Sequence, residues 1–264
     1  MRTLEESAAS ISVLPEGCVL DILSRTSPAD ACRAAAVSKS FNSAAESNVI
    51  WDKFLPLDHH EIIVRAVSNV VFDSKKRLYS LLSYSYLLLD RGTLGFKLDK
   101  ESGKKCYMLS ARDLSIAWQN DTRYWEWGRI PESRFEEVGI LREVWWLDIK
   151  GKMATAFLSP KTTYVAYLVF RISRRPIGLD VPAKSIVTFG GMRNETSNVY
   201  LQPPPVTTTQ TQVSHTTRKD GWMEIVLGEF YCDDGDEGEV EMVFKEHHRW
   251  KSGLIVEGIE VRPK

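Results

Sequence analysis

The side chains of this sequence that could bind a metal ion gather in one acidic loop and two histidine pairs. The loop, Asp233-Asp234-Gly235-Asp236-Glu237, offers the carboxylate oxygens that calcium prefers. Its spacing does not fit an EF-hand, because Gly238 stands where a ligand is needed and no bidentate glutamate follows at the required distance. We therefore predict a solvated turn at this loop.

The histidines occur as the adjacent pairs His59-His60 and His247-His248, without the i, i+4 spacing or the nearby thiols of a zinc site. The sequence also has no glycine loop that could cradle a phosphate and no nucleophile elbow. None of the cysteines has an activating context; they are Cys18, Cys32, Cys106 and Cys232. We expect no metal, no cofactor and no catalytic site.

The composition limits the partners of the chain. Its 34 basic and 35 acidic residues give a net charge of -1, which creates no field that would attract nucleic acid or a membrane surface. No stretch reaches the roughly 18 apolar residues of a membrane helix, and residues 1–13 do not read as a signal peptide. The cysteines are far apart, and Cys18 and Cys32 are expected to be small buried side chains. A reducing, cytoplasmic and nuclear location is expected.

The segment from Leu14 to Pro56 reads as a series of very short helices. Val19, Ile22 and Leu23 recur at helical spacing, so they share one helix face. Ser27 and Pro28 fit the N-cap and the first position of a second helix, which is predicted to run through Val37. A third helix should bury Phe41, Ala44 and Ala45, and a fourth should begin at an Asn48 cap. The apolar side chains outnumber the positions that such helices can bury, which favours a docking module; the alternative is a helical hairpin packed on the rest of the chain.

These positions resemble the F-box, the helical module that joins a substrate receptor to a ubiquitin ligase. The matching positions are Leu14-Pro15, Ile22-Leu23, Pro28, Val37 and Trp51, and the sequence departs from the usual pattern where Phe41 replaces a tryptophan. The resemblance implies binding to a Skp-type adaptor and, through it, to a cullin. The residues implied in that contact are Leu14, Pro15, Val19, Ile22, Leu23, Pro28 and Val37.

The pattern then changes from helical to extended. Ser74 can cap an amphipathic helix that bears Leu78, Leu81, Leu82 and Leu89 on one side, and Leu94, Phe96 and Leu98 alternate as in a strand. From residue 105 onward apolar residues recur with a period of two. The predicted strands include 114–118, 125–127, 145–149, 185–189, 199–201, 222–230, 240–244 and 254–261.

One predicted strand, Tyr164 to Ile172, is apolar on both faces and should lie at the centre of a sheet. Gly258 marks a bulge or a close approach in the last strand, and the stretch from Pro203 to Thr217 should be an extended loop. We therefore predict an α+β multidomain protein with a small all-α F-box at residues 1–57, a helical connector at 58–104 and an antiparallel β-sandwich at 105–264.

The tract from Lys105 onward resembles the phloem lectin domain of plants, the Nictaba type. The matching motifs are ARDLSIAW from Ala111, YWEW from Tyr124, WLDIKGK from Trp146, YVAYLVF from Tyr164, DGWMEIVLGEF from Asp220, GEVEM from Gly238 and WKSGLIVEGIEVRP from Trp250. Together with the F-box, the chain is similar to the F-box phloem protein 2-like family. This resemblance implies a lectin-like sandwich on a ligase receptor.

The same resemblance implies a carbohydrate site. Sugars stack their apolar faces on aromatic rings and donate hydroxyl hydrogen bonds to carboxylates. The family's binding residues carry over as Trp118 and Trp125 for stacking and as Glu239 and Glu246 for hydrogen bonding. Other interpretations stay open: Trp118 alternates with apolar residues and could be core, Trp125 lies next to a polar loop and is expected to be exposed, and both glutamates could be surface charges.

The sequence thus favours a non-enzymatic substrate receptor of a Skp-cullin-F-box ubiquitin ligase. It should capture a target protein through a glycan, with recognition of the polypeptide as the alternative. A free cytosolic or nuclear stress-related lectin, in which the helical module is only structural, is the alternative function. An open apolar patch formed by Leu14, Pro15, Ile22 and Leu23 would favour docking, and burial of these residues against the sandwich would exclude it. The target, the glycan and the oligomeric state do not follow from the sequence.

Overall fold

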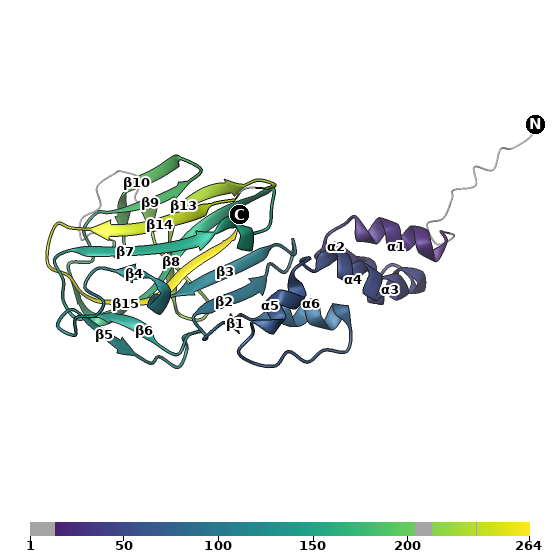
Figure 1. The fold of residues 1–264 in the computed structure, drawn as a ribbon, viewed down its shortest axis with the longest axis horizontal. Coiled ribbons are helices and arrows are strands. Elements are labelled where there is room, and N and C mark those ends of the chain that lie inside the picture. Colours follow the sequence, from purple (N-terminus) through teal and green to yellow (C-terminus); the bar gives the residue numbers. More distant parts are fainter. Residues whose placement is uncertain (1–13, 204–212, 236) are drawn as a thin grey trace, which may run out of the picture. The chain divides into compact units, whose positions relative to one another are not determined.

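The chain forms two compact units, and the computed structural model describes residues 14–203, 213–235 and 237–264 (Figure 1). The helical unit holds the residues up to Val64 together with Asn69–Ser85 and Leu98–Gly103. The sandwich unit holds Arg65–Ser68, Tyr86–Lys97 and Lys104–Lys264. Residues 204–212 of the predicted Pro203–Thr217 loop and Asp236 of the acidic loop lie outside the described residues. The boundaries at residues 57 and 104 stay a prediction.

The helical unit contains six short helices in its described residues, and the first four surround a small apolar core. The core residues are Val19, Leu23, Ala31, Phe41, Ala44, Ala45 and Ile50. Trp51 is also buried and donates its indole hydrogen to the carbonyl oxygen of Ala45 at 2.6 Å. The helices are α1 (Glu16–Ser24), α2 (Pro28–Ala34), α3 (Lys39–Glu46), α4 (Asn48–Phe54), α5 (His59–Val64) and α6 (Lys75–Tyr84).

Serine hydroxyls cap several of these helices, which satisfies amide groups that have no partner within the helix. Ser27 accepts from the amide of Asp30 at the start of α2, as predicted. The cap of α4 is Ser47, so the prediction of an Asn48 cap was wrong; the Asn48 amide oxygen instead accepts from the backbone amide of Lys75 at 2.8 Å. The spacing of neighbouring residues could not reveal the contact between Asn48 and Lys75, because these two residues are 27 positions apart in the sequence.

Three further predictions for this unit need correction. Helix α2 ends at Ala34 rather than at Val37. Cys18 and Cys32 are exposed, not buried. Helix α6 begins at its predicted Ser74 cap, but Leu89 belongs to a strand of the sandwich, because the chain becomes extended after Ser85.

The sandwich unit consists of two mainly antiparallel sheets. Among the described residues, the larger sheet has the order β1-β2-β3-β15-β8-β13-β12, with β6 pairing to β15 and β5 to β6; the smaller has the order β11-β10-β9-β14-β7-β4. The strands are β1 (Leu87–Leu89), β2 (Leu94–Leu98), β3 (Lys105–Ser110), β4 (Ser115–Ile116), β5 (Trp125–Gly128), β6 (Val138–Leu141), β7 (Leu147–Ala154), β8 (Thr162–Ile177), β9 (Ala183–Phe189), β10 (Met192–Tyr200), β11 (Val213–Ser214), β12 (Thr216–Thr217), β13 (Met223–Cys232), β14 (Glu239–Glu246) and β15 (Ser252–Pro263).

The predicted central strand is confirmed as β8, which pairs with β13 on one side and with β15 on the other. The prediction for Gly258 is also confirmed. The register of β15 shifts between Val256 and Gly258, and a side chain at Gly258 would collide with the carbonyl oxygen of Leu109 on β3. The absence of a side chain therefore lets two strands approach closely where the sheet bulges.

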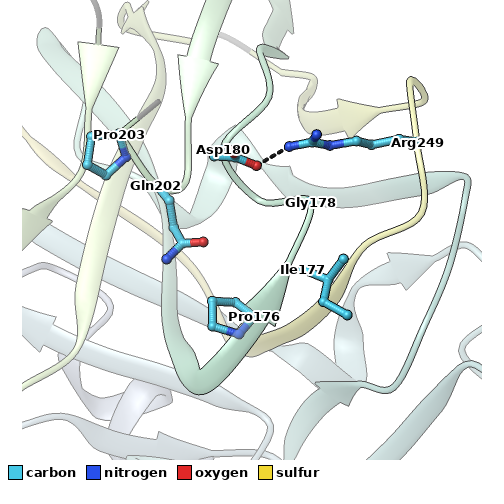
Figure 2. Close-up of a pocket in the computed structure, with 7 residues that line it drawn as sticks. All are labelled: Pro176, Ile177, Gly178, Asp180, Gln202, Pro203 and Arg249. Carbon is cyan, nitrogen blue, oxygen red and sulfur yellow. Dashed lines mark hydrogen bonds and ion pairs between the residues drawn. The ribbon is translucent and has the colours of Figure 1, made fainter. Parts of the chain in front are cut away.

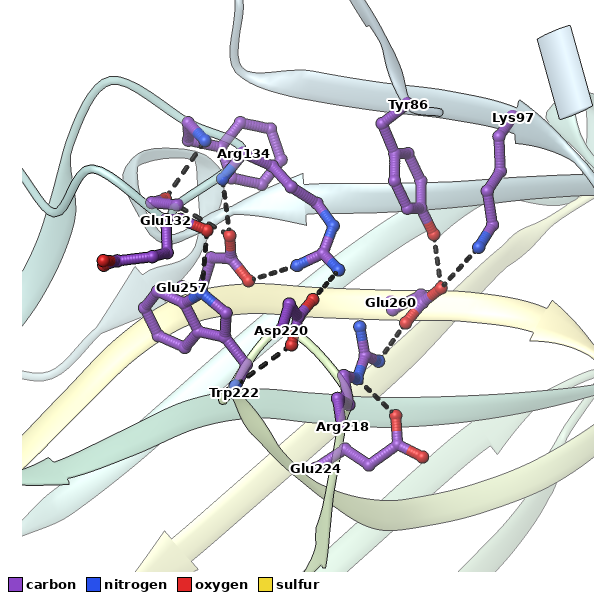
Figure 3. A network of polar contacts seen from close by, with 12 residues as sticks. Tyr86, Lys97, Glu132, Arg134, Arg218, Asp220, Trp222, Glu224, Glu257 and Glu260 are labelled. Carbon is purple, nitrogen blue, oxygen red and sulfur yellow. Dashed lines mark hydrogen bonds and ion pairs between the residues drawn. The ribbon is translucent and has the colours of Figure 1, made fainter. Parts of the chain in front are cut away.

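Strand β15 also carries a buried ionic network, shown in Figure 3. Glu260 is 1% exposed and receives hydrogen bonds from Tyr86, Arg218 and Arg262. Burial opposes ionisation of Glu260, but Arg218, Lys97 and Arg262 outweigh it and lower the pKa of this carboxyl to about 2. The network fastens the segments that carry Tyr86 and Arg218 to the larger sheet.

A second carboxylate of the network, Glu257, holds another loop. It accepts from the amide of Arg134 at 2.7 Å and pairs with its guanidinium at 2.7 Å, and the same guanidinium reaches Asp220 at 2.6 Å. Burial raises the pKa of Glu257 even though Arg134 acts against it. Buried charges on β15 therefore fix the loops on one face of the sheet and contribute directly to the architecture.

Candidate functional site

The most exposed predicted ligand-binding aromatic residue is Trp118, in the turn that follows β4. Its side chain is 57% exposed, and its φ of 66° lies in the left-handed region, which bulky residues rarely adopt. The turn is closed by hydrogen bonds from Gln119 N to Ile116 O and from Asp121 N to Trp118 O. Strained backbone of this kind persists only where the surroundings hold it in place, and it is frequent at binding sites.

Two neighbouring indoles provide that support from β5. Trp125 Nε1 donates to Ala117 O at 3.0 Å, and Trp127 Nε1 donates to Gln119 O at 3.3 Å, so the carbonyl groups on either side of Trp118 are both held. The expectation that Trp125 is exposed was wrong. Its side chain is 1% exposed, because the alternation of β5 directs it into the sandwich. In this structure Trp125 is placed to position Trp118 rather than to stack on a ligand.

The Trp118 turn borders a hollow of about 510 Å³, which we call the Trp118 hollow. Besides Trp118 it is lined by Ile116 and by the polar residues Gln119, Asn120, Asp121 and Thr122. The side-chain oxygen of Gln119 accepts a hydrogen bond from the amide of Ile116 at 3.3 Å. These polar residues were not predicted. The stretch Gln119-Asn120-Asp121-Thr122, directly after a tryptophan, was the signal in the sequence that could have identified them.

The charge of the Trp118 hollow is set by an exposed ion pair. Arg123 donates hydrogen bonds to both carboxylate oxygens of Asp121, and this contact lowers the pKa of that carboxyl. The Tyr124 ring lies 5.8 Å from the Trp118 ring, centroid to centroid. An aromatic face next to an ionised carboxylate and two amides can stack on a pyranose ring and accept hydrogen bonds from its hydroxyls.

The two predicted glutamates do not join one site. They occupy opposite ends of β14 and, at about 3.3 Å per residue, lie roughly 23 Å apart. Glu246 is 4% exposed, with its Oε2 2.5 Å from Lys251 Nζ, and is therefore occupied within the protein. Glu239 is exposed and pairs with Lys152 at 2.8 Å, as a solvated surface charge would.

The predicted adaptor-binding residues divide into two groups. Val19, Leu23 and Pro28 are buried in the helical unit. Pro15 is exposed, Ile22 is 43% exposed, Val37 is 61% exposed, and Leu14 is half-buried. Only the second group offers apolar surface to a partner, whereas the first group holds the helices that present it.

In the part of the chain that the structure describes, no three His, Cys, Asp or Glu side chains come together as a metal site. His247 stacks on Trp146 with ring centroids 3.7 Å apart, and His59 hydrogen-bonds the carbonyl oxygen of Pro56. Among the described residues, no helix combines the length and the apolar character that crossing a membrane requires.

The fold and the motifs together define a two-part protein: an F-box-like helical unit followed by a β-sandwich. Residues 11–55 match the F-box-like family model, and residues 104–263 match the model of phloem protein 2. The chain belongs to the phloem protein 2 family, in a form that carries an F-box-like segment ahead of the family domain.

Full-length relatives share both parts. The chain is 45% identical to the putative F-box protein PP2-B12 of Arabidopsis thaliana, over 95% of this chain and 97% of that protein. It is 41% identical to the F-box protein PP2-B10 of the same plant, over 99% of this chain and 97% of that protein. A solved carbohydrate-binding module in complex with β-1,4-galactotriose matches 57% of this chain and 87% of its own with a TM-score of 0.32 and 9% identity, a likeness too low to assign a ligand.

Proposed function

We propose that this protein is a non-catalytic substrate receptor of a Skp-cullin-F-box ubiquitin ligase and that it captures its target through a glycan. The observation that carries the glycan part is the Trp118 turn. A bulky residue is held at a left-handed φ by two indole hydrogen bonds, and its ring stays exposed next to amide and carboxylate acceptors. Such an arrangement suits a pyranose ring.

The ligase part is supported by the helical unit. Its short helices bury one set of predicted adaptor residues and expose Pro15, Ile22 and Val37. Apolar side chains left at the surface of so small a unit are suited to a protein partner, here a Skp-type adaptor. The receptor then acts by proximity, because a target held next to the charged conjugating enzyme reacts as if the step were intramolecular.

Replacement of Trp118 by alanine is the direct test of the glycan part. We expect the full-length protein, purified with a Skp-type adaptor, to bind glycans that contain N-acetylglucosamine or mannose on an array. Trp118→Ala should weaken this binding at least about fivefold, since a stacking contact contributes on the order of 1 kcal/mol or more. The stability of the variant should stay within about 0.5 kcal/mol of the parent, because the side chain is exposed.

Trp146→Ala is the matched control, because Trp146 is 50% exposed but lies outside the Trp118 hollow. Equal binding by the parent and both variants would contradict the assignment of Trp118. A blank array with folded protein would exclude glycan capture and favour recognition of the target's polypeptide.

A further inference from the structure

A second hollow, of about 600 Å³, lies where β8 ends, away from the residues that form the Trp118 hollow. It is bordered by the end of β8, by the turn after it and by the segment between β14 and β15. Figure 2 shows the Asp180–Arg249 ion pair at one end of the hollow and Pro176 and Ile177 at the other. We call it the Arg249 hollow; its lining residues are Pro176, Ile177, Gly178, Asp180, Gln202, Pro203 and Arg249.

The walls of the Arg249 hollow are fixed to one another. Gly178 has a φ of 67°, and a side chain there would collide with the carbonyl oxygen of Trp250, so the turn fits closely against the segment that carries Arg249. Gln202 N donates to Leu179 O at 3.1 Å, which joins the turn to the chain after β10. Leu179 and Leu201 are buried and anchor these two segments in the core. The hollow is therefore preorganised, which lowers the entropic cost of binding.

The chemistry of this hollow matches a neutral, polyhydroxylated ligand. Asp180 and Arg249 compensate each other's charge, so the site favours neither an anion nor a cation. The carboxylate accepts hydrogen bonds, the guanidinium donates them, and the Gln202 amide does both. Ile177 is 62% exposed and, with the prolines, offers an apolar surface to the C–H groups of a sugar ring.

We propose that the Arg249 hollow is a second carbohydrate-binding site, independent of Trp118, which takes a neutral hexose unit of a glycan. The inference that the ligand of this hollow is a carbohydrate rests on the proposed function. Two sites on one sandwich would let the protein bind a branched or extended glycan at two points, and the second contact then acts at a high effective concentration. Weak single sites would in this way produce specific capture of a target.

The test is an NMR titration of the full-length protein, purified with a Skp-type adaptor, with the trisaccharides of N-acetylglucosamine and of mannose as separate probes. The indole N–H signal of Trp118 reports on the first site, and the side-chain N–H signals of Gln202 and Arg249 report on the second. We expect one of the probes to shift the Gln202 and Arg249 signals saturably. The same saturable shift of these two signals should persist in Trp118→Ala. Arg249→Met should weaken binding at this hollow at least fivefold, as measured on the Gln202 signal.

Arg193→Met is the matched control, because Arg193 also forms an exposed ion pair, with Glu195, but lines neither hollow. The exposed pairs of Arg249 and Arg193 should contribute little to stability, so both variants should fold. A shift of the Trp118 signal alone would overturn the second site and leave the proposed function intact. A shift of the Gln202 signal alone would support the second site and remove the assignment of Trp118. No shift with either probe would overturn both.

Discussion

Replacement of Glu260 by glutamine is expected to lower the free energy of unfolding of the sandwich by about 3 to 5 kcal/mol at neutral pH. The carboxylate is 1% exposed and pairs with Arg218, Arg262 and Lys97. Its removal takes one counter-charge from these partly buried cations and leaves Glu224 as the remaining partner of Arg218 and Arg262. Denaturant unfolding followed by tryptophan fluorescence measures the change, because Trp222 and most other tryptophans lie in the sandwich unit.

The pH dependence of the same variant gives a second, sharper readout. The pKa of Glu260 falls from 4.5 to about 2 on folding, so its contribution to stability is complete above pH 4.5 and is lost as the pH falls toward 2. The difference in unfolding free energy between the parent and Glu260→Gln should therefore be constant near neutral pH and shrink below pH 4.5. Burial raises the pKa of Glu257, so the contribution of that carboxyl to stability falls as the pH rises. Because the parent and the variant both keep Glu257, its contribution cancels in the difference between them.

Glu239→Gln is the control for this experiment. Its carboxylate pairs with Lys152 at the surface, where an ion pair contributes about 0 to 1 kcal/mol. If both glutamine variants lost the same small amount of stability, the network around Glu260 would not be important for holding the loops on β15.

The positions of most strands followed from the sequence because burial of one sheet face imposes a period of two. That rule failed at Trp118 for a physical reason. The alternation of Leu114, Ile116 and Trp118 would place all three on one face, and the first two are indeed buried. The chain turns after Ile116, however, and the positive φ at Trp118 directs its ring outward. No local pattern predicts such a φ for a tryptophan, because contacts with Trp125 and Trp127 of another strand stabilise it.

The sequence also could not predict which of the individual glutamates are buried and which are exposed. Glu246, Glu257 and Glu260 are buried, whereas Glu239 is at the surface, although all four lie in the consecutive strands β14 and β15 of the chain. The cations that pair with Glu257 and Glu260 are Arg134 and Arg218, which lie far from them in the sequence, whereas Glu246 pairs with Lys251 only five residues away. The position of each glutamate in the folded chain therefore decides whether its carboxylate is accessible to a ligand.

Introduction of aspartate at both Ile22 and Val37 is expected to weaken binding to a Skp-type adaptor at least about a hundredfold, which corresponds to about 2.8 kcal/mol. Both side chains are exposed in the helical unit, so the substitutions should not disturb its core. In a complex they would place two unpaired charges in an apolar contact, which is the costly step. Biolayer interferometry with the purified adaptor measures the affinity, and circular dichroism checks the fold.

Val49→Asp is the matched control, because Val49 is 59% exposed on α4 but is not among the predicted adaptor-binding residues. It should keep its affinity for the adaptor, and the double variant should keep its glycan binding, since the substitutions lie in the helical unit and the Trp118 hollow lies in the sandwich. Leu23→Asp would be uninformative, because Leu23 belongs to the core and the variant would unfold. Unchanged adaptor affinity in a folded Ile22→Asp, Val37→Asp protein would contradict docking through these residues and favour the function of a free lectin, in which the helices only support the sandwich.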